Sequence, residues 1–584
     1  MRRVLKGLKV LVLLALALSL GGCSAILTEE SDGEASTASA HLSVEKADPA
    51  ARVFPEDEAL YAEDDTDVVC FYVTVLGGNS ADGTDHTLEE VNRYLNLQNM
   101  TGVEKIRTEV LLQVGDEEGP LKGEVGFSDI ASNATMNVRG RTSTGYAQKS
   151  YRFTLFDNAG FWRTQRALAL NKHPADITRL RNTLYFKLLQ EVPSIPSLRT
   201  QFVHMYVRDL TADAKAVFED YGLYTQVELP NNRYLRNHGL SVDGYLYKAN
   251  LCELYRYPDE LKLVTDPDYD EALFETVLES KTGDDHTKLL AMLDAVNDYS
   301  LSTEEVLDTY FDIDNLTSYM AFNLLMGNQD SNAQNYLLYS PLGGTRWYYI
   351  CWDGDDCLNE SERALREKDW MEGAWTRGVS NYWGVVLFNR ALRLPSFREA
   401  LQEKMELLRG IITPERVKEL IERYRAVVDP YVARLPDSEG MRVEADVRNA
   451  VLEQMPGDVE KSYQHYLDSL VSPMPFFQGN VELDAGELVF VWDASYDFQG
   501  EFLRYDVALA KDWSFEDPIF EATGLLDTTV RVPVPESGEY YWRVTVTNES
   551  GYTQTSFDSV ITSSGSHNGM RRFTITDEGV VNPE

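Results

Sequence analysis

The secondary-structure pattern changes twice along the 584-residue chain, and this order limits the folds that it can adopt. From about residue 68 to 155, runs rich in β-branched and aromatic residues alternate with Gly and Asp breaks, which predicts strands. After Gly239 the pattern is mainly helical, and after the Pro-containing stretch 472–475 short alternating runs return. Because a chain of this length is longer than one hydrophobic core usually organises, we expect more than one domain: an α+β domain followed by a small all-β sandwich.

The predicted elements of the first domain are mixed. We expect strands at 68–76, 106–114, 134–139, 150–155, 201–207 and 222–228, with a helix at 177–191. Later helices are expected from a capping box at Ser302 and over 315–326, 383–393, 395–409 and 413–435, with a hairpin at 336–340 and 346–352. The expected sandwich strands are 488–492, 502–509, 528–532, 540–547 and 553–561.

The first residues form an export signal. Basic residues up to Lys9 precede the apolar run 10–20, which is too short for a comfortable membrane span. Gly21 and Gly22 then precede Cys23, a pattern that resembles a bacterial lipobox, in which the thiol receives a diacylglyceryl group. We therefore expect a lipoprotein signal peptide at 1–23 and an exported protein held at the cell membrane by its lipid. The acidic, apolar-poor stretch 24–64 is predicted to be a disordered tether.

Composition limits the partners and the redox chemistry. Asp and Glu number 94 against 54 Lys and Arg, a formal charge of −40, so nucleic acid is not an expected partner. Cys70, Cys252, Cys351 and Cys357 remain besides Cys23. Their even number permits disulfides, but buried thiols are an equally good interpretation.

Polar residues flank the two strands of the predicted hairpin at its open end. Asp330 and Asn335 precede its first strand, while Asp353 and Asp355 follow its second. A hairpin returns to its starting edge, so these four residues should converge. Hard oxygen ligands of this kind suit Mg²⁺ or Mn²⁺ together with the phosphates of a substrate. A polar hairpin end or a structural Ca²⁺ site would give the same pattern.

The spacing Asp-x4-Asn followed by an Asp after a hairpin has the form of a protein-kinase catalytic loop and metal motif. This form makes Asp330 the base that orients a hydroxyl, with Asn335 and Asp353 as metal ligands and Asp355 as a further ligand. A basic turn from Arg139 also leads into a strand that opens beside Lys149, as phosphate binding requires.

These motifs together resemble the CotH family of spore-coat-type atypical kinases. The resemblance runs from about residue 65 to 435, inside a domain that we place at 65–472, and rests on segments 136–143, 148–153, 170–171, 180–182, 224–228, 244–248, 335–339 and 350–353. It implies a two-lobed, kinase-like fold and metal-dependent transfer of phosphate from ATP to Ser or Thr residues of a protein substrate. It departs from the family's pattern in beginning the catalytic loop with Asn328-Gln329.

The resemblance also implies roles for single residues. Lys149 matches the nucleotide-phosphate lysine, Asp330 the catalytic aspartate, and Asn335 and Asp353 the metal ligands. Glu228 falls in the segment that connects the lobes. Further candidates for nucleotide-phosphate contact, each of which could instead form a structural salt bridge, are Arg139, Arg141 and Arg181.

The C-terminal part adds an alternative function. Trp492 and the run 540–544 resemble the core of a fibronectin type III module, which we place at 476–564 with a tail at 565–584. Such modules act as spacers or binding surfaces, so a non-catalytic surface adhesin or polysaccharide-binding protein on a kinase-like scaffold is the second interpretation. A hydrolase is disfavoured, because Gly-x-Ser-x-Gly and His-Glu-x-x-His are absent from the sequence.

Overall fold

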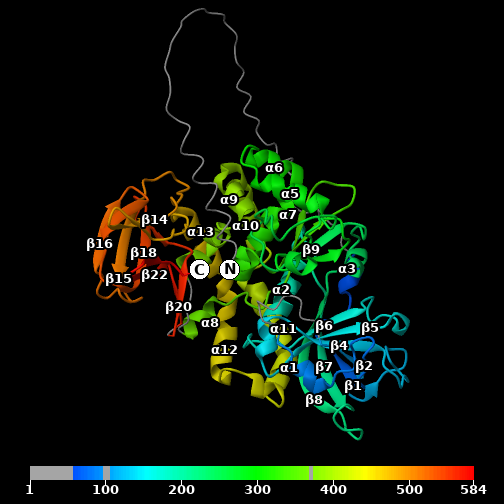
Figure 1. The fold of residues 1–584 in the computed structure, drawn as a ribbon. Coiled ribbons are helices and arrows are strands. Elements are labelled where there is room, and N and C mark those ends of the chain that lie inside the picture. Colours follow the sequence, from blue (N-terminus) through cyan, green and yellow to red (C-terminus); the bar gives the residue numbers. More distant parts are fainter. Residues whose placement is uncertain (1–56, 96–105, 367–372, 564, 584) are drawn as a thin grey trace, which may run out of the picture.

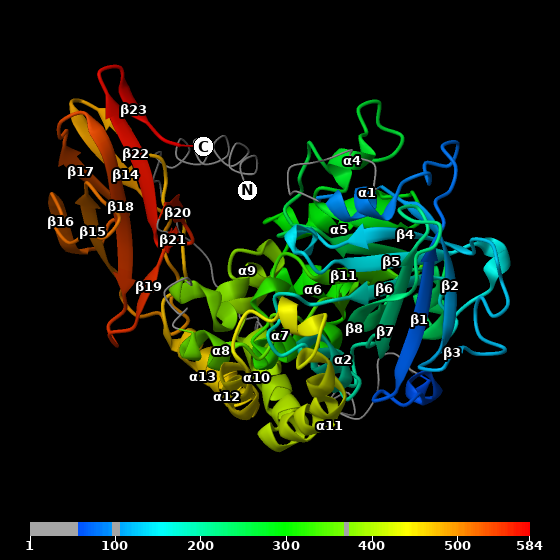
Figure 2. The same cartoon turned by 90° about the horizontal axis from the view of Figure 1, so that it is seen from below.

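A computed structural model describes residues 57–95, 106–366, 373–563 and 565–583. It contains both helices and sheets, which confirms the α+β class. It forms three units: a barrel, a helical unit and a sandwich. The helical unit lies between the other two, with the barrel and the sandwich on opposite sides (Figures 1 and 2).

The first unit is a closed barrel. Its sheet runs β1-β7-β8-β6-β5-β4-β2-β3, and an additional pairing of β1 with β2 closes it. The strands are β1 (Val68–Val75), β2 (Thr108–Asp116), β3 (Gly119–Pro120), β4 (Ala134–Arg139), β5 (Ser150–Leu155), β6 (Ala167–Asn171), β7 (Thr200–Asp209) and β8 (Glu219–Glu228). Alternate residues of β1, namely Phe71, Val73 and Val75, are fully buried inside. Helix α1 (Leu88–Arg93) adds Leu88 to the same core.

The second unit is built mainly of helices. They are α2 (Arg181–Leu189), α3 (Asn232–Asn237), α4 (Glu271–Phe274), α5 (Thr287–Asn297), α6 (Thr303–Tyr310), α7 (Ile313–Met326), α8 (Glu360–Leu365), α9 (Val386–Arg393), α10 (Pro395–Arg409), α11 (Pro414–Val432), α12 (Ala445–Gln454) and α13 (Asp458–Val471). Ser302 caps α6, as the sequence predicts. Gly327 ends α7 with a left-handed φ of 60°. Every residue of α7 from Asn315 to Met326 is buried, so this helix lies inside the core.

A four-stranded sheet crosses this helical unit. Its order is β10-β9-β11-β12, with β9 (Tyr245–Ala249), β10 (Leu278–Thr282), β11 (Tyr336–Ser340) and β12 (Tyr348–Cys351). The hairpin β11–β12 matches the prediction, but β9 and β10 lie in a stretch that we predict as mainly helical. These two strands are short and follow loops, so their local pattern is weak, and they form because β9 pairs with β11.

The third unit is a β-sandwich. One sheet has the order β13-β14-β17 and the other β16-β15-β18-β22-β23, with β19 paired to β18 and β20 paired to β21. The strands are β13 (Glu482–Asp484), β14 (Glu487–Val491), β15 (Arg504–Ala510), β16 (Phe520–Leu525), β17 (Thr529–Pro533), β18 (Gly538–Thr547), β19 (Thr553–Thr555), β20 (Ser559–Thr562), β21 (Gly565–Asn568), β22 (Met570–Thr576) and β23 (Gly579–Val581). Phe490 and Trp542 meet edge to face at 4.9 Å between the sheets.

Two predicted boundaries need correction. Residues 565–583 are not a tail, because β22 pairs with β18 and buries Phe573 and Ile575 in the sandwich core. At the other end, the last residues of the predicted tether join the fold: Glu58–Tyr61 form a 3₁₀ turn, and Glu63 pairs with Arg163 at 3.3 Å. The predicted signal peptide and Cys23 lie outside the described residues.

The sequence leaves open whether the four later cysteines form disulfides or are buried thiols. Cys70, Cys252, Cys351 and Cys357 are all reduced and buried in the described part of the chain.

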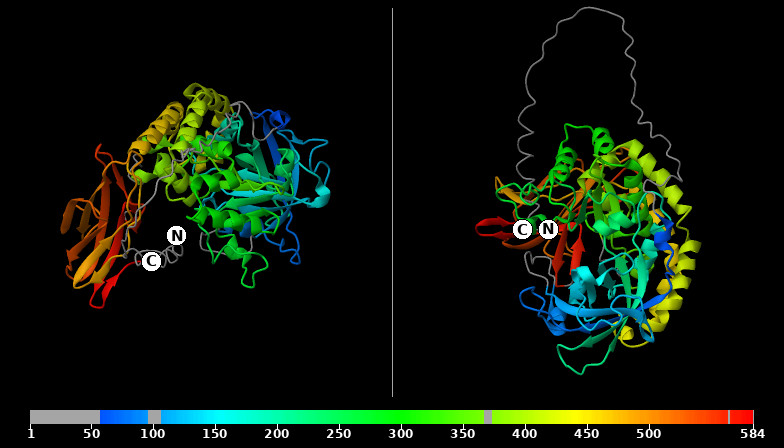
Figure 3. Two further views of the ribbon diagram at one scale, coloured as in Figure 1. Left: turned by 90° about the horizontal axis from the view of Figure 1, so that it is seen from above. Right: turned by 90° about the vertical axis from the view of Figure 1, so that its right-hand side faces the viewer.

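None of the described helices is long and apolar enough to cross a membrane. The left view of Figure 3 again shows the helical unit between the sandwich and the barrel.

Candidate active site

The hairpin places Asn335 and Asp353 side by side. Tyr336 lies opposite Cys351 in the register, and the backbone N–H of Trp352 donates to the carbonyl oxygen of Asn335 at 3.1 Å. Both flanking residues adopt a left-handed backbone, with φ of 58° at Asn335 and 51° at Asp353. Asn and Asp tolerate this conformation better than other residues, and such outliers often occur at functional sites.

Gly354 explains the spacing after Asp353. A Cβ atom at this position would lie 2.1 Å from Cγ of Tyr185, which is fully buried against Phe322 of α7. Because backbone and ring approach so closely, this position requires glycine. The Asp-Gly-Asp sequence thereby holds Asp353 and Asp355 on a chain segment that is pressed against the core.

Asp330 enters the site from the other side. It lies in a short 3₁₀ turn, Gln329–Ser331, directly after the end of α7. Asp330 as a residue is exposed, but protein atoms crowd its carboxylate. Desolvation, and then the negative charge of Asp353, raise the pKa of this carboxylate above the ordinary value. Asp330 and Asp353 are thus close enough to repel one another.

Asp355 completes a group that we call the carboxylate cluster: Asp330, Asp353 and Asp355. The pKa of Asp355 is raised well above its ordinary range, first by Asp353 and then by burial. Asp356 and Asp330 add to this effect. Crowded carboxylates that disfavour one another's ionisation are a common feature of sites that bind a cation or hold a proton.

Two cations face the carboxylate cluster. Arg139 ends β4, and burial lowers its pKa to about 10 while Asp353 opposes the shift. Lys248 of β9 has a pKa lowered to about 8, again by burial, with Asp353 among the groups that oppose it. Both lie near the Trp352 ring, with centroid distances of 5.9 Å from Arg139 and 5.5 Å from Lys248. Cations over an indole are stabilised by its electron-rich face.

Lys248 has no assigned role in the sequence prediction. Its segment, 244–248, is among those that carry the family resemblance, which is the one sequence signal that points to it. The pairing of β9 with β11 places it next to the hairpin, because Lys248 lies opposite Leu337.

Two asparagines bind Asp353. Asn182 of α2 donates from Nδ2 to Oδ1 of Asp353 at 3.1 Å, and Asn328 donates to its backbone carbonyl at 3.4 Å. The Oδ1 atoms of both asparagines are buried without a hydrogen-bond partner among the described residues. Buried amide oxygens of this kind normally need a partner such as water or a cation.

His173 is a further buried group near the cluster. It follows β6 with a φ of 49°, and burial lowers its pKa to about 4 against the influence of Asp176 and Asp353. Its Nε2 has no hydrogen-bond partner among the described residues. The imidazole is therefore neutral at pH 7. No role was predicted for His173, because a single histidine after a strand gives no sequence signal of its own.

Arg181 takes the structural alternative that the sequence leaves open. The residue is 1 % exposed, and its guanidinium forms ion pairs with Asp176 at 2.7 Å and Glu362 at 3.0 Å. Burial opposes the charge, but these two carboxylates outweigh it and raise the pKa of Arg181. The residue joins α2 to α8.

Glu228, at the end of β8, is also fully engaged. Arg199 binds its carboxylate at 2.6 Å, His238 at 3.2 Å and Asn237 at 3.2 Å. Burial opposes ionisation, yet the hydrogen bonds from His238 and Arg199 lower the pKa of Glu228 to about 2. We call these four residues the Glu228 cluster.

The remaining predicted cations lie at the turn after β4. Lys149 donates from Nζ to the carbonyl oxygen of Thr144 at 2.6 Å, and desolvation lowers its pKa. Arg141 is exposed and reaches the carbonyl oxygen of Asn250 in the helical unit at 3.4 Å. These contacts order the turn beside Arg139.

The residues fit a divalent cation that a substrate helps to hold. Within the described residues, no three Asp, Glu, His or Cys side chains form a group that could hold a metal ion. Mg²⁺, however, usually takes only one or two carboxylates and completes its shell with water and phosphate oxygens. The mutual repulsion of Asp353 and Asp355 and the unpartnered amide oxygen of Asn182 are consistent with such a cation. Asn335, Asp353 and Asp355 are the residues that would hold it.

Comparison with known proteins identifies a family. A family model described as CotH kinase protein matches residues 136–464, which span the site from Arg139 to Asp355. No curated protein matches the chain. Because the matched segment covers more than half of the sequence, the chain belongs to the CotH kinase family.

Proposed function

We propose that this protein is an exported, lipid-anchored kinase that transfers the γ-phosphate of ATP to Ser or Thr hydroxyls of a protein substrate, with Mg²⁺ or Mn²⁺. The barrel would be the N-terminal lobe and the helical unit the C-terminal lobe of a kinase-like fold. The observation that carries the proposal is the convergence of Asp330, Asn335 and Asp353 at the open end of the hairpin.

Asp330 is the proposed base. The acceptor oxygen attacks the γ-phosphorus, its proton passes to the Asp330 carboxylate, and the bond to the β-phosphate oxygen breaks to release ADP. A raised pKa suits this role, because a more basic carboxylate accepts a proton more readily. When bound, the divalent cation would neutralise phosphate charge.

Arg139 and Lys248 are the proposed phosphate-binding cations on the protein. The pKa values of both respond to Asp353, so both lie within its electrostatic reach. The sequence assigns this role to Lys149, which holds the neighbouring turn through Thr144. We propose that Lys149 and Arg141 support the phosphate site by ordering this turn, and that Arg139 contacts the phosphates directly.

A transfer assay tests the proposal. The protein from Ser24 onward is incubated with γ-labelled ATP and Mn²⁺ or Mg²⁺, beside Asp330→Asn, Asp353→Asn and the exposed control Asp517→Asn. Label should appear on the protein or on added casein with the wild type and the control, and be lost in the two site variants. No transfer by a folded wild type would favour the non-catalytic surface-binding function.

The location is a separate proposal. The signal peptide 1–23 would direct export, and Cys23 would carry the lipid. Cys23→Ala should abolish labelling by a radioactive fatty acid and release the protein from the membrane fraction. Continued membrane retention of Cys23→Ala would disprove the anchor without affecting the kinase proposal.

The C-terminal sandwich, which we propose to be fibronectin type III-like, would present a surface to envelope or polysaccharide partners.

A further inference from the structure

Residues 374–384 lie between the Asp330 loop and the C-terminal sandwich. We call them the bridging segment. The segment contains two short 3₁₀ turns, Ala374–Thr376 and Gly378–Tyr382. One part of it binds the loop that carries Asp330, and another part packs against the sandwich.

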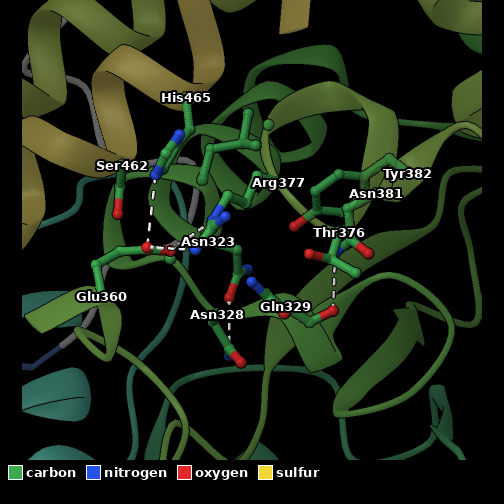
Figure 4. A pocket seen from close by; sticks show the side chains of 13 residues that line it. Asn323, Asn328, Gln329, Glu360, Thr376, Arg377, Asn381, Tyr382, Ser462 and His465 are labelled. Carbon is green, nitrogen blue, oxygen red and sulfur yellow. Dashed lines mark hydrogen bonds and ion pairs between the residues drawn. The ribbon is translucent and has the colours of Figure 1, made fainter. Parts of the chain in front are cut away.

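The contacts with the loop surround Asp330 on both sides. Before it, Nδ2 of Asn381 donates to the carbonyl oxygen of Gln329 at 2.8 Å. After it, the hydroxyls of Tyr382 and Ser331 are 2.7 Å apart, and Asn332 donates to the carbonyl oxygen of Asn381 at 2.9 Å. Figure 4 shows Asn381 and Gln329 joined in this way.

These contacts are shielded from water. Asn381 is 6 % exposed and Tyr382 is 1 % exposed, while Ser331 is completely buried. Hydrogen bonds in such surroundings are costly to lose, because the polar atoms left behind cannot bind water. Asn381 and Tyr382 therefore restrict where the backbone on each side of Asp330 can lie.

The contacts with the sandwich are aromatic. Trp375 meets Phe557 edge to face with centroids 5.1 Å apart, and Trp383 stacks on Tyr496 at 5.5 Å. Phe557 is held in turn by its backbone N–H, which donates to the carbonyl oxygen of Phe476 at 2.9 Å. The sandwich thus contacts the bridging segment near both of its ends.

An ion-pair group anchors the middle of the segment to the helical unit. Arg377 binds Glu360 of α8 at 2.9 Å, and His465 of α13 lies 3.5 Å from the same carboxylate (Figure 4). Burial opposes ionisation of Glu360, but hydrogen bonds from His465 and Arg377 outweigh it and lower the pKa to about 2. These ion pairs hold the segment against the helical unit. Because Tyr382 of the loop contacts and Trp383 of the sandwich contacts are adjacent in sequence, a displacement at one set of contacts can reach the other.

We infer that the C-terminal sandwich positions Asp330 through the bridging segment, with Asn381 and Tyr382 as positioning residues. The catalytic consequence rests on the proposed kinase function, whereas the mechanical coupling does not. In this arrangement a partner that binds the sandwich and shifts Phe557 or Tyr496 alters the Asp330 loop without touching it.

The test uses the protein from Ser24 onward with three variants. Phe557→Ala removes the ring that contacts Trp375, and Tyr382→Phe removes only the hydroxyl that contacts Ser331. Phe502→Ala is the control, because Phe502 belongs to the same sandwich but is 72 % exposed. Hydrogen exchange of peptides covering 328–335 is the first readout and is independent of any enzymatic activity.

Both Phe557→Ala and Tyr382→Phe should accelerate exchange in 328–335 by about tenfold, with no change in barrel peptides and no change in the control. Unaltered exchange in 328–335 for Phe557→Ala, in a folded protein, would overturn the coupling. In the transfer assay, kcat should fall by about tenfold while KM for ATP stays within about twofold, because the Asp330 loop moves and the phosphate contacts do not. A rise in KM with kcat unchanged would contradict the positioning role.

If the wild type shows no transfer, the kinase proposal fails while the exchange experiment still decides the coupling. If transfer occurs and all three variants behave like wild type in both readouts, the kinase proposal stands and the coupling is wrong.

Discussion

The carboxylate cluster and the Glu228 cluster both place acidic groups inside the same domain, yet their electrostatics are opposite. Around Glu228, an arginine, a histidine and an amide bind one carboxylate and lower its pKa to about 2. In the carboxylate cluster, the acids chiefly face one another, and the pKa of Asp355 is raised well above normal. The first arrangement satisfies every charge within the fold, whereas the second leaves a charge that an added cation or proton must balance.

Arg181 follows the same distinction. With Asp176 and Glu362 bound to its guanidinium, it resembles the Glu228 cluster rather than the site. Among candidates chosen from the sequence by residue type, pairing within the fold therefore separates structural charges from functional ones. Three substitutions test this separation.

Asp353→Asn should have the largest effect, on activity. Removing a proposed metal ligand should lower the transfer rate by about 10² to 10³ fold, as does loss of other groups that stabilise a transition state. The melting temperature should not fall, since the amide retains an acceptor for Asn182 and relieves repulsion of Asp330. Initial rates and thermal unfolding check the two parts. A variant that is less stable and still active would place Asp353 among the structural charges.

Glu228→Gln should affect stability instead. It leaves the charge of the partly buried Arg199 without its partner and should lower the free energy of unfolding by about 3 kcal/mol. Denaturant unfolding measures this loss, and Glu219→Gln, at the exposed start of the same strand, is the matched control. Transfer per folded molecule should be unchanged.

The pH dependence of this second prediction has a defined sign. The pKa of Glu228 falls from 4.5 to about 2 on folding, so its stabilising effect is present above pH 4.5 and is lost as the pH falls towards 2. The difference in stability between wild type and Glu228→Gln should shrink over that range. A constant difference down to pH 2 would mean that charge pairing is not its cause.

Asp355→Asn should have the smallest effect, and in the opposite direction. Because folding raises the pKa of Asp355, the wild type loses stability as the pH rises above 3.8, and the neutral variant does not. At pH 7 the variant should be the more stable of the two proteins. Below pH 3.8 the two proteins should unfold alike. A destabilised variant at pH 7 would remove the distinction between the clusters.

Much of the fold was predictable from local pattern. The strands Ala134–Arg139 and Ser150–Leu155 and the helix Pro395–Arg409 have the bounds that alternation and capping indicate. Strands β6, β9 and β10 were not identified as strands, because each is five residues long and owes its conformation to a neighbouring strand. The strands of 565–583 were missed because a short alternating run at a chain end resembles a tail.

The site was predictable where residues are close in sequence. A hairpin sufficed to bring Asn335 and Asp353 together. Asn182 and Lys248 come from elements that are distant along the chain, so only the packed structure places them beside Asp353. Nor could residue type show that Arg181 is already bound to two carboxylates, because that depends on where Asp176 and Glu362 lie.

The parallel pairing of β1 with β7 also bears on the order of events during synthesis. β1 lies parallel to β7, with Val68 opposite Phe202, so the partner of β1 on that side emerges from the ribosome 134 residues later. Until then the barrel cannot close, and such long-range pairing makes folding slow. A nascent chain that stays unfolded in this way can pass through a translocation channel, as the proposed export requires.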